Sequence, residues 1–258
     1  MNSAHTVAVV LPMFNEAASL AAMRRDFAGF DPGPGRRCLL VAVDDGSIDD
    51  TPALLAAWAQ QDDRLKVVTH PQNRGLAAAI FSGMAQALSL GASRVVTMDA
   101  DATHPVGTIP RLLDALDAGA GIAIASRFAP GGKEVGLAPV RKVLSRGARA
   151  YLRLRFPLRG VRDYSTSFRA YTAEVLRPVA GGALRLTCPG SFAASVELLL
   201  RLAGGGGAVP VEVPMVLRYD NKQSPSKLRA LRTILDYLRL GLQPGRRGPA
   251  GRGLKLSS

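Results

Sequence analysis

The sequence predicts an α/β fold in which a mostly parallel sheet is flanked by helices. Short, uninterrupted apolar runs alternate along the chain with longer segments whose apolar residues recur at helical spacing. Such runs are typical of strands buried on both faces, and their alternation with helices is typical of a parallel sheet. The chain has 258 residues, of which 47% are hydrophobic and 21% charged, so it can bury one sizeable core and is not intrinsically disordered.

Five strands and four helices are predicted in the first half of the chain. The strands are expected at residues 6–11, 38–43, 65–69, 94–98 and 121–126. The helices are expected at residues 16–27, 51–61, 75–90 and 108–117. In the first helix Leu20, Met23 and Phe27 share one face, and Pro52 suits the first turn of the second. The third helix carries no charge but is too weakly apolar to cross a bilayer, so we assign it to the domain interior.

The second half of the chain has a less regular pattern. We expect a basic helix at 140–154, an extended segment at 161–171, a helix at 192–202, an edge strand at 209–216 and an amphipathic helix at 227–240. Residues 1–240 are expected to form one domain. The tail 241–258 is rich in Gly, Pro and Arg and is expected to be disordered.

Charge is distributed unevenly between the two halves. The net charge is +13, but residues 1–126 hold 9 basic and 13 acidic side chains, whereas residues 127–258 hold 24 basic and 7 acidic ones. This asymmetry indicates an anionic partner for the second half, either a nucleic acid, an anionic lipid or a phosphorylated substrate. The two cysteines exclude a disulfide scaffold and a cysteine-rich zinc module.

Polar side chains gather where four predicted strands end. They are Pro12, Asn15 and Glu16 after the first strand, Asp44 and Asp45 after the second, Asn73 and Arg74 after the third, and Asp99, Asp101, Thr103 and His104 after the fourth. The carboxyl ends of parallel strands meet at one edge of the sheet, and ligands of such folds bind there. The pattern therefore predicts one binding site that draws on all four strand ends.

Two pairs of carboxylates carry most of this prediction. Asp99 and Asp101 can converge on one point, and their repulsion favours a divalent cation, Mg²⁺ or Mn²⁺, shared with substrate phosphates. The alternative is a solvated acidic turn or a helix cap. Asp44 and Asp45 can accept hydrogen bonds from a nucleoside base or ribose, or else form a turn before the next helix. His104 has no partner of metal-ligand type nearby in the sequence, which favours a loop role.

Eight segments together resemble a known family. The segments are LPMFNE (11–16), VDDGSIDDT (43–51), NRGLAAA (73–79), MDADATHP (98–105), ASRF (125–128), RKVLSRGARAYL (141–152), DYSTSFRAY (163–171) and SPSKL (224–228). In this order they are similar to family 2 glycosyltransferases of the GT-A fold, and among these to polyprenyl-phosphate hexosyltransferases of the dolichyl-phosphate mannose synthase type. The resemblance extends from Val7 to about Tyr237.

The resemblance implies a role for each matching residue. The nucleotide-sugar would be held in the half 1–126, by Pro12, Asn15, Glu16, Asp44, Asp45, Arg74 and Asp99. The metal ion, Mg²⁺ or Mn²⁺, would be held by Asp99 and Asp101, with Thr103 at a further contact position. The acceptor phosphate would be held in the half 127–240, by Arg127, Arg141 and Ser145. The residues implied in catalysis are Asp101, Arg127, Arg218 and Lys227, the last two on a loop that closes over the donor diphosphate.

The implied reaction is an inverting, metal-dependent transfer of a hexose from a GDP- or UDP-hexose to a polyprenyl phosphate. A phosphate monoester is already anionic near neutral pH, so this acceptor needs no strong general base, and none is conspicuous beside Arg127 and Arg141. The first alternative is a hydroxyl acceptor on a glycan, glycolipid or natural product, with Asp101, Asp163 or Glu197 recruited as base. The second is a binding module without transferase activity. Nucleic acid is not an expected partner, because aromatic residues make up only 5% of the chain and no nucleic-acid-binding motif is present.

The basic helices of the second half indicate a membrane surface. Residues 141–159 contain seven basic residues interleaved with apolar ones and no acidic residue, and 227–240 again interleaves basic residues, namely Lys227, Arg229, Arg232 and Arg239, with apolar ones. Basic amphipathic helices bind anionic lipid, although a solvated basic face over a packed core is the alternative. No signal peptide or transmembrane segment is recognisable. We therefore expect a cytoplasmic protein that is peripheral on the inner face of the membrane.

Overall fold

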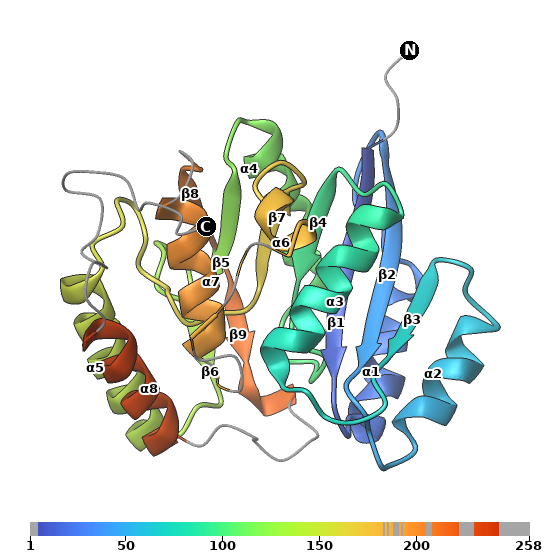
Figure 1. Cartoon of the computed structure of the whole chain (residues 1–258), viewed down its shortest axis with the longest axis horizontal. Helices are drawn as coiled ribbons and strands as arrows, with labels where there is room; N and C mark the ends of the chain where they lie inside the picture. Colours follow the sequence, from blue (N-terminus) through green and yellow to red (C-terminus); the bar gives the residue numbers. More distant parts are fainter. Residues whose placement is uncertain are drawn as a thin grey trace.

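The computed structural model describes residues 5–182, 184, 186–187, 191, 193–204, 208–221 and 230–242 (Figure 1). In the first half the strands are β1 (His5–Met13), β2 (Arg36–Asp44), β3 (Leu65–Thr69), β4 (Arg94–Thr97) and β5 (Ile122–Ser126). The helices between them are α1 (Ala17–Ala28), α2 (Thr51–Ala59), α3 (Leu76–Ser89) and α4 (Ile109–Asp117), the last preceded by a 3₁₀ turn at Val106–Thr108. Each element predicted in this half is present within two residues of its expected bounds.

The second half contains shorter strands and the long helix α5. Its elements are β6 (Lys133–Val135), α5 (Pro139–Arg155), β7 (Arg169–Thr172), α6 (Arg177–Ala180), α7 (Ala193–Gly204), β8 (Pro210–Pro214), β9 (Val216–Arg218), a 3₁₀ turn at Tyr219–Asn221 and α8 (Ala230–Leu242). The segment expected to be extended over 161–171 forms a strand only from Arg169. Helix α8 includes Gly241 and Leu242, which the sequence pattern had assigned to the tail. Residues 243–258 lie outside the described residues.

One seven-stranded sheet organises the domain. Its strand order is β3-β2-β1-β4-β7-β5-β8, with β1 parallel to β2 and β4, and β5 parallel to β8. Strand β7 runs antiparallel to both β4 and β5 in the middle of the sheet. Strand β8 occupies the sheet edge, as its prolines predicted. Strands β6 and β9 pair in parallel as a separate small sheet.

Helices cover both faces of the sheet, as the continuous apolar strands predicted. Buried side chains of α1, α2 and α4 form one core with the sheet, and those of α3, α6, α7 and α8 form the other. Gly83 allows α3 to approach closely, because a Cβ there would overlap the side chains of Val10 and Val43. Among the described residues, no helix combines the length and the apolar character that crossing a bilayer requires.

Candidate active site

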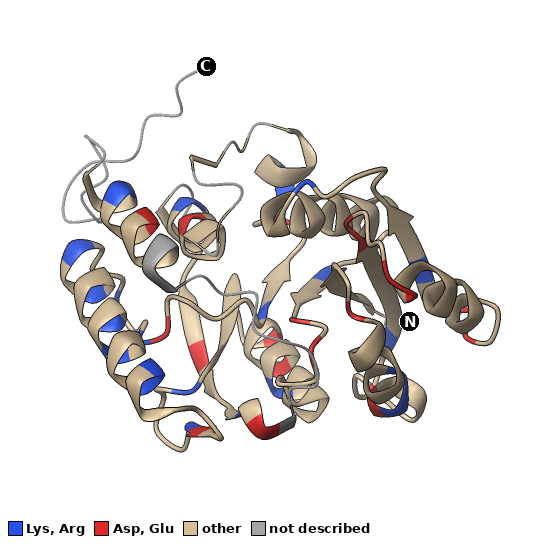
Figure 2. Cartoon of the chain, turned by 90° about the horizontal axis from the view of Figure 1, so that it is seen from below, with Lys and Arg blue, Asp and Glu red and all other residues tan. Residues whose placement is uncertain are grey.

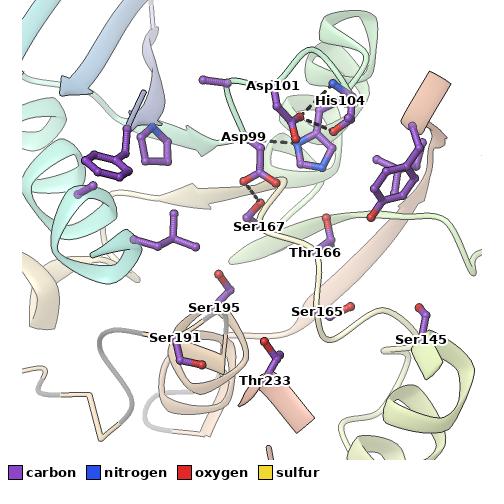
Figure 3. A pocket seen from close by; sticks show the side chains of 18 of the residues that line it. Asp99, Asp101, His104, Ser145, Ser165, Thr166, Ser167, Ser191, Ser195 and Thr233 are labelled. Carbon is purple, nitrogen blue, oxygen red and sulfur yellow. Dashed lines mark hydrogen bonds between the residues drawn. The ribbon is translucent and has the colours of Figure 1, made fainter. Parts of the chain in front are cut away.

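A cavity of about 480 Å³ opens at the carboxyl ends of the central strands (Figure 3). Nine of the residues predicted for the site line it, namely Pro12, Glu16, Asp45, Asp99, Asp101, Thr103, Arg127, Arg141 and Ser145. Pro12 is the second-to-last residue of β1, and the loops after β2, β4 and β5 supply the aspartates and Arg127. Helix α5 supplies Arg141 and Ser145. The fold therefore brings the predicted donor and acceptor residues to one cavity.

Asn15 and Asp44 stabilise the cavity rim and do not line the cavity. The Asn15 backbone has a positive φ of 51°, and its side-chain Oδ1 accepts a hydrogen bond from the Ile48 N–H at 2.9 Å. The Asp44 carboxylate, 1% exposed, accepts the Ser47 N–H at 3.0 Å. The Asn15 bond fastens the loop after β1 to the loop after β2, and the Asp44 bond closes a turn within the second loop. For Asp44, the structure therefore matches the turn interpretation of the acidic motif.

The Asp45 carboxylate lines the cavity and is fixed from three sides. It accepts the N–H groups of Arg74 at 3.0 Å and Gly75 at 2.8 Å, just before α3 begins. His70 Nδ1 lies 2.6 Å from Asp45 Oδ1, and His70 Nε2 lies 2.9 Å from Ser82 Oγ. This role of His70 was not predicted, because its partner lies 25 residues away in the sequence. Arg74 contributes its backbone here, while its side chain is exposed.

Asp99 and Asp101 are each oriented by a neighbouring hydroxyl group. Ser167 Oγ donates to Asp99 Oδ1 at 2.6 Å, and Thr103 Oγ1 donates to Asp101 Oδ1, also at 2.6 Å. Ala102, between Asp101 and Thr103, has a φ of 60°, a left-handed conformation that costs free energy for a residue with a Cβ. His104 Nδ1 accepts the Asp99 N–H at 3.1 Å, which confirms its loop role. The two carboxylates are thus held in place before any ligand binds.

Arg127 is buried between two carboxylates. Its Nε lies 3.1 Å from Glu134 Oε1 and 3.3 Å from Asp163 Oδ2, as ionic contacts without hydrogen-bond alignment. Its Nη2 donates to Ser165 Oγ at 2.8 Å and to Ser145 Oγ at 3.3 Å. Burial on its own lowers the pKa of the guanidinium, but the charges of Asp163 and Glu134 outweigh it and raise the pKa. Arg127 therefore stays charged, and the buried carboxylates of Glu134 and Asp163 compensate its charge.

The structure does not bring Arg218 into the cavity. Its guanidinium is half-exposed and binds both oxygens of Asp220, with Nη2 at 2.6 Å and Nε at 3.2 Å. Only its backbone reaches the site, where the N–H donates to the Thr103 carbonyl at 3.1 Å. Lys227, predicted to act with it, lies outside the described residues.

Several cavity residues were not predicted. They are Tyr219, Tyr237, Thr166, Ser167, Ser191, Ser195 and Thr233. The three consecutive hydroxyl residues at 165–167 are a sequence pattern that could have indicated a polar site. Ser195 and Thr233, by contrast, reach the site only through the packing of α7 and α8. Burial raises the pKa of Tyr237 to about 12, and burial also raises that of Tyr219. Both phenols therefore remain protonated hydrogen-bond donors at neutral pH.

The donor set at Asp99 and Asp101 fits a hard divalent cation. Within the described part of the chain, no group of three or more His, Cys, Asp and Glu side chains is arranged to hold a metal by itself. Mg²⁺ and Mn²⁺ do not need such a cage, because they are commonly bound by one or two carboxylates together with substrate phosphates and water. Two oriented carboxylates on the wall of an open cavity match that mode of binding.

Comparison with known proteins gives the family of this chain. The family model described as "Glycosyl transferase family 2" matches residues 8–179. The chain therefore belongs to glycosyl transferase family 2.

Two curated relatives and one solved structure illustrate the similarity. The chain is 36% identical over 208 residues to polyprenol monophosphomannose synthase of Mycolicibacterium smegmatis, covering 80% of this chain and 75% of the relative. It is 32% identical over 240 residues to dolichol-phosphate mannosyltransferase of Pyrococcus furiosus, covering 90% of this chain and 62% of that longer protein. The structure of glucosyl-3-phosphoglycerate synthase from Mycobacterium tuberculosis with Mn²⁺, uridine diphosphate and phosphoglyceric acid superposes with a TM-score of 0.68 at 19% identity, covering 94% and 80% of the two chains. This last similarity supports the GT-A fold.

The burial of Arg127 predicts a structural role for this residue. Arg127→Met leaves Glu134 and Asp163 as buried, uncompensated charges, and we expect the unfolding free energy to fall by about 3–5 kcal/mol. Adding Asp163→Asn to this variant removes one of those charges and should restore about 1 kcal/mol or more. Urea denaturation of the single and double variants measures both effects.

Arg218→Met is the matched control, because its ion pair is on the surface and should contribute little to stability. Equal stability of the Arg127→Met and Arg218→Met variants would contradict the buried network.

Proposed function

We propose that this protein is an inverting, metal-dependent hexosyltransferase that moves a hexose from a nucleoside diphosphate sugar to a polyprenyl phosphate. The names of its curated relatives, which are polyprenol- and dolichol-phosphate mannosyltransferases, support this acceptor and make mannose the first hexose to test. The observation that carries the proposal is the distribution of charge around the cavity, with carboxylates at one end and arginines at the other.

All the carboxylates on the cavity wall belong to the donor end. Within the described residues they are Glu16, Asp45, Asp99 and Asp101, which follow β1, β2 and β4. Asp163 is 1% exposed beside Arg127, and Glu197 is fully buried against Arg201 and Thr187, so neither of these two lines the cavity. An alcohol acceptor needs a base near the arginines, whereas a phosphate monoester brings its own negative charge. This favours a phosphate acceptor.

At the donor end, Asp45 and Glu16 are proposed to contact the nucleoside, with Pro12 forming the adjacent wall. Ionised carboxylates only accept hydrogen bonds, and base N–H groups and ribose hydroxyls are suitable donors. Asp45 keeps its orientation because two backbone N–H groups and His70 already hold it. Asn15 and Asp44 act indirectly, by fixing the loops that carry these residues.

Asp99 and Asp101 are proposed to hold the metal ion, with Thr103 orienting Asp101. A bound Mg²⁺ or Mn²⁺ supplies positive charge that stabilises the departing nucleoside diphosphate. Thr103 donates to Asp101 Oδ1 through both its hydroxyl and its backbone N–H, and so orients this carboxylate. Arg218 and Lys227 remain proposed donor-diphosphate contacts, which for Arg218 requires release from Asp220.

At the acceptor end, Arg141, Arg127 and Ser145 are proposed to bind the lipid phosphate. Arg141 projects from the first turn of α5 into the cavity, and Ser145 lies one turn further along the same face. Arginine is well suited to a phosphate because its planar guanidinium donates two parallel hydrogen bonds. Attack by the phosphate oxygen from the side opposite to the leaving diphosphate inverts the anomeric centre.

The reaction can be tested with a panel of GDP- and UDP-hexoses, Mg²⁺ or Mn²⁺, and a short polyprenyl phosphate, with products identified by mass. We expect a hexosyl phosphoryl polyprenol with one of the donors, and no product when the phosphate is replaced by the free alcohol. Hydrolysis of the donor without lipid product, or transfer to the alcohol, would instead favour the hydroxyl-acceptor alternative.

The metal assignment predicts a selective defect. Asp101→Asn keeps the shape of the side chain but halves the charge at the proposed metal site, so turnover should fall by about 10²-fold or more. Folding should be preserved, because Asn Oδ1 can still accept from Thr103. Initial rates titrated with Mn²⁺ and reversed with a chelator measure the defect. Asp114→Asn, on the outer face of α4, is the control, and equal activity of the two variants would remove the assignment.

A membrane surface is the proposed partner of the helix pair α5 and α8, with the protein peripheral on the cytoplasmic face. Helix α5 has one buried residue, Leu152, and carries the basic residues Arg141, Lys142, Arg146, Arg149, Arg153 and Arg155 without an acidic one (Figure 2). Large apolar side chains stand exposed on both helices, namely Val140, Val143, Leu144 and Leu154 on α5 and Leu235, Leu238 and Leu242 on α8. Exposed apolar groups among basic ones are typical of interfacial helices.

The helix pair itself is held together by close packing, so it can act as one unit. A Cβ at Gly241 would overlap the Tyr151 hydroxyl, and Arg155 Nε donates to the Gly241 carbonyl at 2.6 Å. Residues of both helices line the acceptor end of the cavity. A lipid acceptor bound there would therefore leave the cavity beside the proposed membrane surface.

This surface can be tested by vesicle co-sedimentation. Val143→Asp, at a side chain that is 68% exposed on α5, should weaken binding to phosphatidylglycerol-rich vesicles by about tenfold, because it removes an inserted apolar group and adds a repelled charge. Val209→Asp, 64% exposed before β8, is the matched control. Equal binding of the two variants, or equal binding of the wild type to purely zwitterionic vesicles, would contradict the assignment.

A further inference from the structure

The Ser195 hydroxyl is a buried polar group for which the described part of the chain offers no hydrogen-bond partner. Ser195 lies in the first turn of α7, is 3% exposed and lines the cavity, yet its Oγ has no partner among the described residues. Buried hydroxyls in folded proteins are nearly always hydrogen-bonded, so an unpartnered one at a cavity wall indicates a missing ligand. In Figure 3 its oxygen points to the side of the cavity where Asp99 and Ser167 lie.

Other hydroxyl groups accompany Ser195 on this part of the wall. Thr166, Ser191 and Thr233 line the same cavity, and we call these three together with Ser195 the hydroxyl wall (Figure 3). Thr166 and Thr233 are 5% and 7% exposed. They come from the segment before β7, the start of α7 and the start of α8, so three distant parts of the chain converge on this surface.

A buried arginine holds the hydroxyl wall in position. Arg169 in β7 is 1% exposed and donates to the Ser195 carbonyl at 2.5 Å and to the Tyr164 carbonyl at 2.6 Å. It thereby ties the first turn of α7 to the segment that carries Thr166. The backbone that carries the Ser195 side chain is consequently held in place before a ligand arrives, which lowers the entropic cost of binding.

The chemistry of the hydroxyl wall matches a sugar better than a phosphate. None of its four members is a cation, whereas the charged contacts for phosphate, Arg127 and Arg141, lie at the acceptor end. Serine and threonine hydroxyls both donate and accept hydrogen bonds, which is what a sugar hydroxyl requires. The N-terminus of α7 is also partly satisfied, because Ser191 accepts the Ala193 and Ala194 N–H groups through its hydroxyl and carbonyl.

We propose that the hydroxyl wall is the subsite that recognises the hydroxyls of the transferred hexose, with Ser195 Oγ in direct contact with one of them. The inference rests on the proposed hexosyl transfer. In that reaction the sugar must lie between the diphosphate, near Asp99 and Asp101, and the acceptor phosphate, near Arg127 and Arg141. The four members of the hydroxyl wall line the same cavity as these charged residues.

A substrate–enzyme double-mutant cycle tests the contact directly. The wild type and Ser195→Ala are assayed with the active nucleotide-hexose and with its monodeoxy analogues, each lacking one sugar hydroxyl. Ser195→Ala should lower kcat/KM for the full donor by about 3- to 10-fold, the value of one hydrogen bond, and leave affinity for the free nucleoside diphosphate within about twofold. For one deoxy donor the two enzymes should have equal kcat/KM, because the contact is already absent.

Two controls separate this contact from general damage. Ser89→Ala removes a hydroxyl that binds the Gln86 carbonyl outside the cavity, and it should change no donor parameter. Thr233→Val is an isosteric change in the same wall. It should also lower kcat/KM for the full donor, and for one deoxy donor its kcat/KM should equal that of the wild type. If Ser195→Ala lowers kcat/KM equally for every donor, or does not lower it, the inference is overturned, but the proposed hexosyl transfer still stands. Absence of transfer by the wild type from any nucleotide-hexose would instead overturn the proposed function and, with it, the inference.

Discussion

The buried ion network around Arg127 is the interaction on which the acceptor side of the cavity depends. A guanidinium with 10% of its side chain exposed is stable only if carboxylates compensate its charge, and Glu134 and Asp163 do so from two different segments. Through Ser165 and Ser145, the same side chain also connects the segment before β7 to helix α5. Arg127, at the end of β5, thereby joins strand β6, the segment before β7 and helix α5, which is proposed to bind the lipid phosphate.

The donor side is organised differently, by backbone and hydroxyl groups that orient carboxylates. Asp45 is held by two N–H groups at the start of α3, Asp101 by Thr103 and Asp99 by Ser167. These bonds come from backbone N–H and hydroxyl groups, and they orient carboxylates that line the cavity. The wall of one cavity thereby carries both the carboxylates proposed to hold a metal ion and the arginines proposed to hold a phosphate.

Much of this arrangement was predictable from the sequence, because the strands are continuous apolar runs and the parallel order forces their polar ends together. The antiparallel position of β7 between β4 and β5 was not predictable, because the four residues at 169–172 do not encode which strands they pair with. Arg218 was expected in the cavity, but Asp220, two residues away, offers a nearer partner. The hydrogen bond from Arg169 to the Ser195 carbonyl could not be predicted, because it joins β7 to α7 across 26 residues.

The central claim is that the acceptor supplies its own negative charge and that the protein provides no base at the acceptor end. The most direct test is the pH dependence of kcat/KM for the acceptor, measured with a polyprenyl phosphate and with a more acidic difluoromethylphosphonate analogue. We predict that the rate rises through the second ionisation of the acceptor, at about pH 6 for a phosphate monoester, and that the inflection moves to lower pH with the analogue. An inflection that stays at the same pH with both acceptors would show that a group of the protein is the base and would contradict the account.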